Sequence, residues 1–197
     1  MWEGDVSDFT DVNRITLKEL ERLIKIRTIE GLKLTPSLDY VSKDKLKMVQ
    51  KNFKDDILTG SFALSFFTDL ETARKNMIWS SSVKRERSMS DIDIISKRFS
   101  KSDLTQPSFD PHIILAYLDF MGSKTITEYS LFGLKRIHHK VDVFNYDADF
   151  IEFEGLKIHN PLDIIRAKVN ILNDFGEMYK SIMTYNKHYV DIMHIIG

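Results

Sequence analysis

The chain has 197 residues, of which 43% are hydrophobic and 29% charged, a balance that suits a globular protein with one sizeable core. The formal net charge of −1 provides no overall basic field, which weakens a nucleic-acid-binding interpretation without removing a local basic patch. The absence of cysteine excludes disulfides, thiolate zinc sites and cysteine nucleophiles.

The first residues, Met-Trp-Glu-Gly-Asp, lack the basic region and apolar run of a signal peptide. No segment of the sequence has the length of apolar residues needed to cross a bilayer. We therefore expect a cytoplasmic protein without a membrane partner.

The opening third of the chain shows helical periodicity. Apolar residues recur at helical spacing from Leu17 to Ile24, and again from Leu38 to Val49 after Pro36. The basic residues between them suit a solvated face. These patterns predict a helical extension over residues 1–52.

Residues 53–158 alternate strand and helix patterns and predict the core. In chain order we expect a strand at 56–59, a helix from Ser61, a strand at 91–95, a helix at 109–120, strands at 125–131 and 140–144, and a further strand within 151–158. Residues 159–197 predict two helices, from Pro161 to Leu172 and from Met178 to Ile196. The expected fold is α+β, with a mixed sheet flanked by helices.

Three aspartates are the strongest candidate for a functional site. Side chains alternate along a strand, so Asp91 and Asp93 share one face of their strand. Asp142 lies in a second apolar strand, and the three carboxylates converge if the two strands are neighbours. Carboxylates this close repel each other, and Mg²⁺ is a suitable neutralising ion because it prefers oxygen ligands. The alternative is an exposed edge strand whose charges prevent aggregation.

The Gly60-Ser61 pair follows the first predicted strand of the core and begins a helix. Free backbone N–H groups at such a turn attract phosphate, and glycine allows close approach of the backbone. Ordinary capping of the helix by Ser61 is the alternative interpretation, and it is compatible with the first.

The C-terminal helices contain two further candidates. Projected on a helix, Lys168 falls among the apolar residues Ile164, Ile165, Ile171 and Leu172. A lysine on that face needs an anionic partner such as Asp142, a substrate phosphate, or a route to water. Lys187 and Asp191 have i, i+4 spacing, for which helix geometry alone favours an ion pair in water.

Three motifs in order, Leu58-Thr59-Gly60-Ser61, Ser90-Asp91-Ile92-Asp93-Ile94 and Val141-Asp142-Val143-Phe144, resemble those of the DNA polymerase β-like nucleotidyltransferase superfamily. The tail motifs, 160–168 and 187–191, look like those of the abortive-infection type of toxin nucleotidyltransferases. The resemblance covers residues 55 to 196. The interval between Ser61 and Asp91 is longer than in compact members, which suggests an insertion over 73–89.

The resemblance implies a nucleotidyltransferase that moves an NMP from an NTP to an acceptor hydroxyl. It assigns Mg²⁺ or Mn²⁺ to Asp91, Asp93 and Asp142, with Asp142 also a candidate base. It assigns the bound nucleotide to the following residues: Gly60, Ser61, Ser90, Lys168, Lys187 and Asp191. The acceptor is left open among RNA (a tRNA end included), a protein and a small molecule, and a toxin–antitoxin or abortive-infection role implies a cognate antitoxin as partner.

Two alternatives come from other classes of protein. One is a catalytically inactive nucleotidyltransferase-like domain that binds a nucleotide or a partner. The other is an α/β interaction protein whose acidic strand is merely exposed. Thermal stabilisation by Mg²⁺ with each NTP, together with label transfer from α-labelled NTP, separates all three.

Overall fold

The computed structural model describes residues 34–75, 91–106, 119–129, 133, 135–179, and eight more positions near the two ends: 22, 25, 188, 191, 192 and 194–196. The chain forms two compact units. One contains residues 41–63 and 89–160, and we call it the sheet unit. The other contains residues 1–40, 64–88 and 161–197, and we call it the helical unit. The expected division at 1–52, 53–158 and 159–197 stays a prediction.

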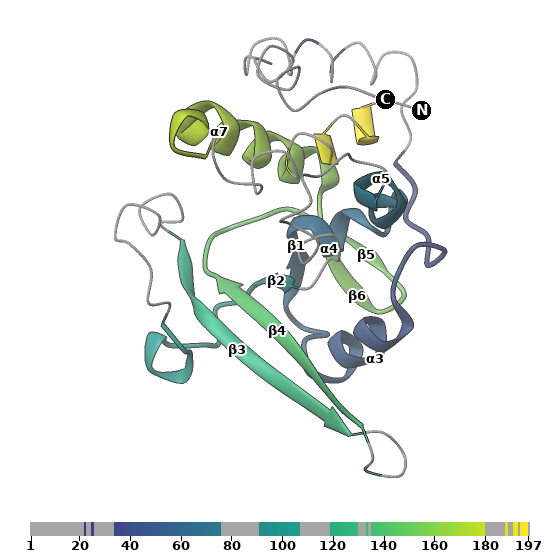
Figure 1. The fold of residues 1–197 in the computed structure, drawn as a ribbon, viewed down its shortest axis with the longest axis vertical. Helices are drawn as coiled ribbons and strands as arrows, with labels where there is room; N and C mark the ends of the chain where they lie inside the picture. Colours follow the sequence, from purple (N-terminus) through teal and green to yellow (C-terminus); the bar gives the residue numbers. More distant parts are fainter. Residues whose placement is uncertain are drawn as a thin grey trace. The chain divides into compact units, whose positions relative to one another are not determined.

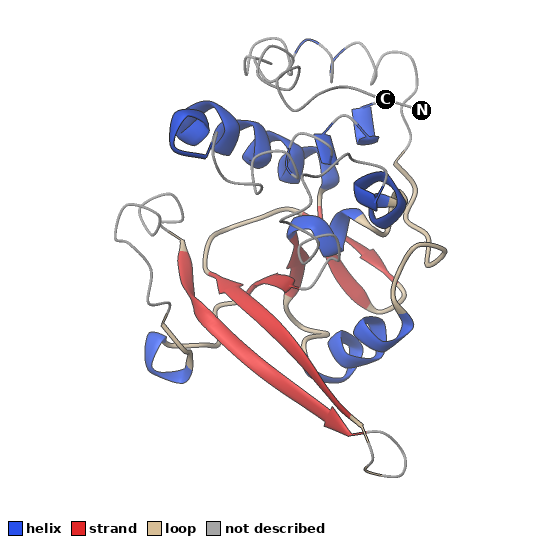
Figure 2. Cartoon of the chain, viewed as in Figure 1, coloured by secondary structure: helices blue, strands red, loops and turns tan. Residues whose placement is uncertain are grey.

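The sheet unit is built on a six-stranded mixed sheet (Figures 1 and 2). The strands are β1 (Ile57–Thr59), β2 (Asp91–Ile95), β3 (Phe120–Tyr129), β4 (Arg136–Phe144), β5 (Phe150–Phe153) and β6 (Leu156–His159). Their order is β3-β4-β2-β1-β6-β5. β2 pairs in parallel with β4, and β1 in parallel with β6, whereas the other neighbours are antiparallel. The expected α+β class with a mixed sheet is therefore confirmed.

One face of this sheet carries the apolar core, because the strands alternate as period-two patterns require. Six side chains on this face are completely buried: Leu58, Ile92, Ile94, Val141, Val143 and Ile158. We call it the core face. The opposite face carries Asp91, Asp93 and Asp142, and we call it the carboxylate face.

The strand bounds correct several sequence-based expectations. β2 has the expected bounds, but β3 and β4 begin earlier than expected, at Phe120 and Arg136, and form the long hairpin of Figure 1. The single strand expected within 151–158 is a pair, β5 and β6, because the chain reverses at Glu154 and Gly155, where φ is 51° and 72°. A Glu-Gly turn lacks the Asn-Gly or Asp-Gly signature that predicts such a reversal.

The helices of the sheet unit are short. α3 (Lys43–Asn52) begins later than the expected helix, because residues 38–40 form a turn, and it buries Met48 and Val49. A 3-10 turn, η3, spans Lys101–Asp103. α4 (Gly60–Leu64) follows β1 directly and ends where the helical unit resumes. The helix expected over 109–120 falls mostly outside the described residues, but Phe120 itself begins β3.

The helical unit contains α5 (Leu70–Lys75) and α7 (Pro161–Tyr179), which is longer than the helix expected to end at Leu172. α5 includes the first residues of the expected 73–89 insertion, so that segment begins as helix, and residues 76–89 lie outside the described part. The described residues from 188 to 196 are helical, and the rest of the expected 178–196 helix past Tyr179 is not described.

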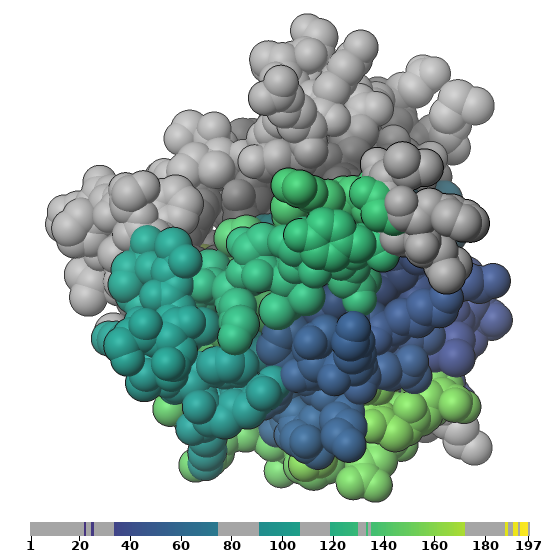
Figure 3. Space-filling model, turned by 90° about the horizontal axis from the view of Figure 1, so that it is seen from below, coloured from purple at the N-terminus to yellow at the C-terminus, as the bar shows by residue number. Residues whose placement is uncertain are grey.

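Arg98 joins the end of α3 to the segments that flank β1 and β2. Its guanidinium donates to the buried carboxylate of Asp56 at 2.6 and 2.9 Å and to the Asn52 carbonyl at 2.6 Å. It also lies 5.4 and 4.5 Å from the ring centroids of Phe53 and Phe99. In the space-filling view, the teal surface of the segment after β2 borders the blue surface of the α3 segment (Figure 3).

Among the described residues, no helix combines the length and the apolar character that crossing a membrane requires.

Candidate active site

The sheet register brings the three predicted aspartates onto one face of neighbouring strands. Asp93 and Asp142 are direct partners in the parallel β2–β4 pair, and Asp91 lies two residues before Asp93. Residues opposite each other in a ladder point to the same side of the sheet. The expected convergence of these residues on one face is therefore present, with Asp91 and Asp142 41% and 17% exposed.

Gly60 lies against the carboxylate of Asp93. β1 pairs antiparallel with β2, with Thr59 opposite Asp93, and Gly60 follows with a φ of +64°. A Cβ atom placed on Gly60 would lie 1.9 Å from Asp93 Oδ2 and 2.8 Å from its Cγ. Only glycine suits this position, because the backbone is left-handed and the carboxylate occupies the space of a side chain. The glycine turn and the carboxylate face thus form one site.

Two side chains bind the carboxylate of Asp142 directly. Ser123 of β3 donates from Oγ to Asp142 Oδ1 at 2.5 Å, and Lys140 Nζ lies 3.3 Å from Asp142 Oδ2. The same ammonium lies 3.8 Å from Asp91 Oδ2. Lys140 therefore bridges two of the three predicted carboxylates.

The pKa of Lys140 reflects the negative charge of the carboxylate face. Partial burial lowers its pKa, but the negative charges of Asp142, Asp91 and Asp93 outweigh that effect and raise the pKa above its ordinary value. All three carboxylates therefore act on one point in space, and they favour a cation there. Within the described ranges, no three His, Cys, Asp or Glu side chains are grouped closely enough to hold a metal ion ready-made.

A buried polar cluster continues the carboxylate face along β1 and β6. The Thr59 hydroxyl lies 2.9 Å from His159 Nδ1 and also hydrogen-bonds the hydroxyl of Tyr146. Burial raises the pKa of Tyr146, the bond to Thr59 opposes that change, and the charge of Asp93 adds to it. Tyr146 is therefore held neutral beside the acidic residues.

Lys168 and Asp191 form a second polar cluster, which lies in the helical unit. Lys168 is on the buried face of α7, as expected, and its Nζ lies 2.9 Å from Asp191 Oδ2 and 3.1 Å from His188 Nδ1. Arg74 of α5 donates to both oxygens of the same carboxylate, at 2.9 and 2.6 Å. Burial alone would raise the pKa of Asp191, but the charges of Lys168 and Arg74 and their hydrogen bonds hold it well below its usual range.

This cluster corrects two expectations. The carboxylate that neutralises Lys168 is Asp191 and not Asp142, and Lys168 is only 4% exposed, so it does not extend to water. Asp191 is fully buried, so the expectation that it forms a solvent-exposed ion pair is wrong. Periodicity places a residue on a helix face, but it does not say which distant segment covers that face.

The remaining predicted residues have different outcomes. Ser61, the first residue after Gly60, is 9% exposed. Ser90 and Lys187 lie outside the described residues, and the phosphate-binding roles of Ser61, Lys168 and Asp191 stay predictions.

Sequence reasoning missed four residues of the carboxylate face and its neighbourhood: Thr59, Ser123, Lys140 and Tyr146. Lys140 had a usable signal, because it lies two residues before Asp142 and alternation puts both on one face. Ser123 depends on the β3–β4 register, and Tyr146 depends on the path of the chain after β4. Neither can be read from local pattern.

Comparison of the chain with protein-family models, with curated proteins and with solved structures found no match.

Proposed function

We propose that this protein is a metal-dependent nucleotidyltransferase, which moves an NMP from an NTP to an acceptor hydroxyl. The observation that carries the proposal is the contact between Gly60 and Asp93. It joins a glycine turn at the start of a helix to a face that bears three carboxylates on neighbouring strands. The same arrangement of motifs underlies the resemblance to the DNA polymerase β-like superfamily, and we extend the proposal to a nucleotidyltransferase-like fold.

The donor set of the carboxylate face fits a hard divalent cation. Asp91, Asp93 and Asp142 offer oxygen ligands only, and their combined charge already raises the pKa of the nearby Lys140 ammonium. When bound there, Mg²⁺ or Mn²⁺ would neutralise charge that develops on the phosphates.

The residues of the chain have separate tasks in the proposed reaction. The backbone at Gly60 and Ser61 holds the outer phosphates of the NTP. The acceptor oxygen attacks the α-phosphorus and forms a new O–P bond, while the P–O bond to pyrophosphate breaks. Asp142 accepts the proton of the attacking hydroxyl, and Ser123 fixes the orientation of Asp142 by its hydrogen bond.

The test is the substitution Asp93→Asn, with Asp39→Asn at an exposed position outside the sheet as the matched control. We expect Asp93→Asn to abolish NMP transfer from α-labelled NTP, because a neutral amide neither holds the cation nor keeps the negative field. The melting temperature should stay nearly unchanged, because the two side chains have the same shape. Full transfer by Asp93→Asn would remove the metal-binding role of this face.

A second candidate is a catalytically inactive domain that binds a nucleotide. The position of Lys140 favours it, because an ammonium already lies between Asp91 and Asp142. Thermal stabilisation by NTP without label transfer to RNA, protein or small-molecule acceptors would support this candidate. The absence of stabilisation by every NTP would instead support an interaction protein. The toxin role and a cognate antitoxin remain part of the first proposal.

A further inference from the structure

A cavity of about 360 Å³ opens on the carboxylate face, at the end of β1 away from Gly60. Its base is formed where three strands are in register, with Ile57 opposite both Ile95 and Lys157. Ile95 lies two residues beyond Asp93 on β2, so the cavity is about 7 Å from the carboxylate along the strand. Alternation puts Ile57, Ile95 and Asp93 on the same face of the sheet.

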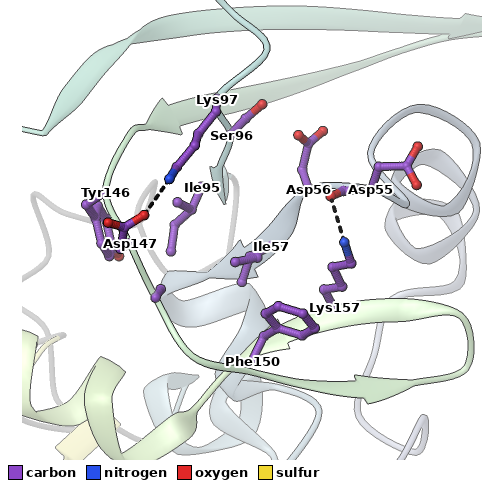
Figure 4. A pocket seen from close by; sticks show the side chains of 11 residues that line it. Asp55, Asp56, Ile57, Ile95, Ser96, Lys97, Tyr146, Asp147, Phe150 and Lys157 are labelled. Carbon is purple, nitrogen blue, oxygen red and sulfur yellow. Dashed lines mark hydrogen bonds and ion pairs between the residues drawn. The ribbon is translucent and has the colours of Figure 1, made fainter.

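The base of this cavity is aliphatic, and two aromatic side chains, Tyr146 and Phe150, stand among the charged residues of its walls. Figure 4 shows Ile57 near the centre, with Tyr146 on one side and Phe150 and Lys157 on the other. Lys157 Nζ lies 5.2 Å from the centroid of the Phe150 ring, a cation–π contact that holds Lys157 beside this aromatic side chain. Aromatic side chains favour stacked or edge-to-face contact with another ring.

The charges around the cavity are balanced. Asp147 pairs with Lys97, Asp56 pairs with Arg98, and Asp55 and Lys157 remain as one charge of each sign. The cavity therefore demands no net charge of its occupant. Its volume lies at the lower end of the range for small-molecule pockets, about 300–1,000 Å³.

Tyr146 connects the cavity to the proposed reaction centre. It lines the cavity and hydrogen-bonds Thr59, which lies opposite Asp93 in the β1–β2 pair. The order along the carboxylate face is thus Gly60, then Asp93 with Thr59, then Tyr146 and the cavity.

We propose that this cavity holds the acceptor, and that the acceptor is a small uncharged molecule with an aromatic ring and a hydroxyl on a short arm. This inference rests on the proposed function, which puts the outer phosphates at Gly60. In an in-line displacement, the attacking oxygen approaches the α-phosphorus from the side opposite the departing pyrophosphate. The side opposite Gly60 is the side of the cavity. The ring lies between Tyr146 and Phe150, and the hydroxyl points toward the paired carboxylates of Asp93 and Asp142, of which Asp142 accepts its proton.

The first test measures binding without the reaction, by saturation-transfer NMR with 4-hydroxybenzyl alcohol as the probe and cyclohexylmethanol as its saturated comparison. We expect wild-type protein to bind the aromatic probe more tightly than the saturated one. Ala148→Trp, which fills the cavity from its lining loop, should raise the Kd of the aromatic probe at least tenfold. Phe150→Ala should raise it about two- to tenfold, because one aromatic contact is lost. Tyr129→Ala, an exposed aromatic on β3, is the control and should change nothing.

Equal affinity for the aromatic probe in wild type and in folded Ala148→Trp would overturn the proposal. The proposal is also overturned if Ala148→Trp weakens the binding of Mg²⁺-NTP as much as that of the probe, because the cavity would then hold the nucleobase of the NTP. The substitution Asp93→Asn separates this proposal from the proposed function. If transfer requires Asp93 but probe binding is unaffected by Ala148→Trp, the acceptor assignment alone fails. If transfer persists in Asp93→Asn, the proposed function fails whatever the probe does.

Discussion

Replacing Gly60 by alanine tests the contact on which the proposed site depends. Two effects add at this position. The φ of +64° is a left-handed conformation that costs a residue with a side chain about 1–2 kcal/mol. The new Cβ would also lie 1.9 Å from Asp93 Oδ2, far inside the 3.4 Å of ordinary contact. Asp93 must therefore leave its position, because its short side chain offers no other way to relieve the overlap.

We expect the displacement of Asp93 to cost a further 1–3 kcal/mol or so, as overpacking of a filled site does. For a chain of this length, each 1 kcal/mol corresponds to about 2–4 °C in melting temperature. The effect on function should be larger than the effect on stability. A shift of about 1 Å in a reacting or binding group can reduce the rate about 100-fold.

Gly155→Ala provides the matched control for the backbone effect. Gly155 has a φ of +72°, but a Cβ atom there would meet nothing within 4 Å. Thermal unfolding of both variants, followed by circular dichroism, gives the contact effect as the excess destabilisation in Gly60→Ala. In an Asp93→Ala background, the clashing Oδ2 and Cγ atoms are gone and only the Cβ of residue 93 remains, at 3.0 Å, so Gly60→Ala should cost clearly less than in the wild type. NMP transfer should be lost in Gly60→Ala and retained in Gly155→Ala.

Equal destabilisation by Gly60→Ala and Gly155→Ala in the wild-type background would refute the argument. It would mean that the Asp93 carboxylate does not press on Gly60 in solution. A Gly60→Ala protein with full transfer activity would also show that the close approach has no role in the reaction.

Three further predictions concern the other charged groups. Asp191→Asn should destabilise the protein by about 3–5 kcal/mol, because the buried cations that share Asp191 lose their counter-charge. The wild-type carboxylate has a lowered pKa, so its contribution to the free energy of unfolding is complete above the unfolded-state pKa of about 3.9 and is lost as the pH falls below that value. Acid unfolding, followed by the circular dichroism of the folded protein, should therefore be less steep below pH 4 in the variant. Arg98→Ala should lower the melting temperature clearly, because it leaves the buried carboxylate of Asp56 unpaired. Lys97→Gln breaks an exposed ion pair and should leave the melting temperature unchanged in the same thermal unfolding assay. Lys140→Gln should strengthen the binding of Mn²⁺, measured by electron paramagnetic resonance, because it removes an ammonium that competes for the carboxylates; weaker binding would contradict the proposed cation site.

Local rules predicted the members of the carboxylate face, but not the β2–β4 pairing that brings Asp142 beside Asp93. Alternation along β2 sets Asp91 and Asp93 together, and the apolar neighbours of Asp142 mark its strand as part of the core. The partners of these residues depend on register between segments far apart in the chain. Ser123 meets Asp142 across the β3–β4 ladder, and no local pattern fixes that pairing.

In the helical unit, too, the sequence predicts which face of a helix is buried but not which distant residues contact that face. The apolar periodicity of α7 placed Lys168 on the buried side correctly. Its carboxylate partner is 23 positions later in the chain, and Arg74 reaches that same carboxylate across 117 positions. A buried lysine requires an acidic partner to neutralise it, but this requirement does not identify which acidic residue that is.

The alternation of β2 also makes the strand intolerant of insertion. Adding one residue inside Asp91–Ile95 would exchange its two faces beyond that point, turning aspartate toward the apolar interior and isoleucine toward solvent. Burying an unpaired carboxylate costs several kcal/mol, a large share of the roughly 5–15 kcal/mol that stabilises a folded domain. One added residue between Glu154 and Gly155 would only lengthen an exposed hairpin loop. Deep insertion scanning should therefore find β2 almost free of tolerated length changes and the β5–β6 turn rich in them.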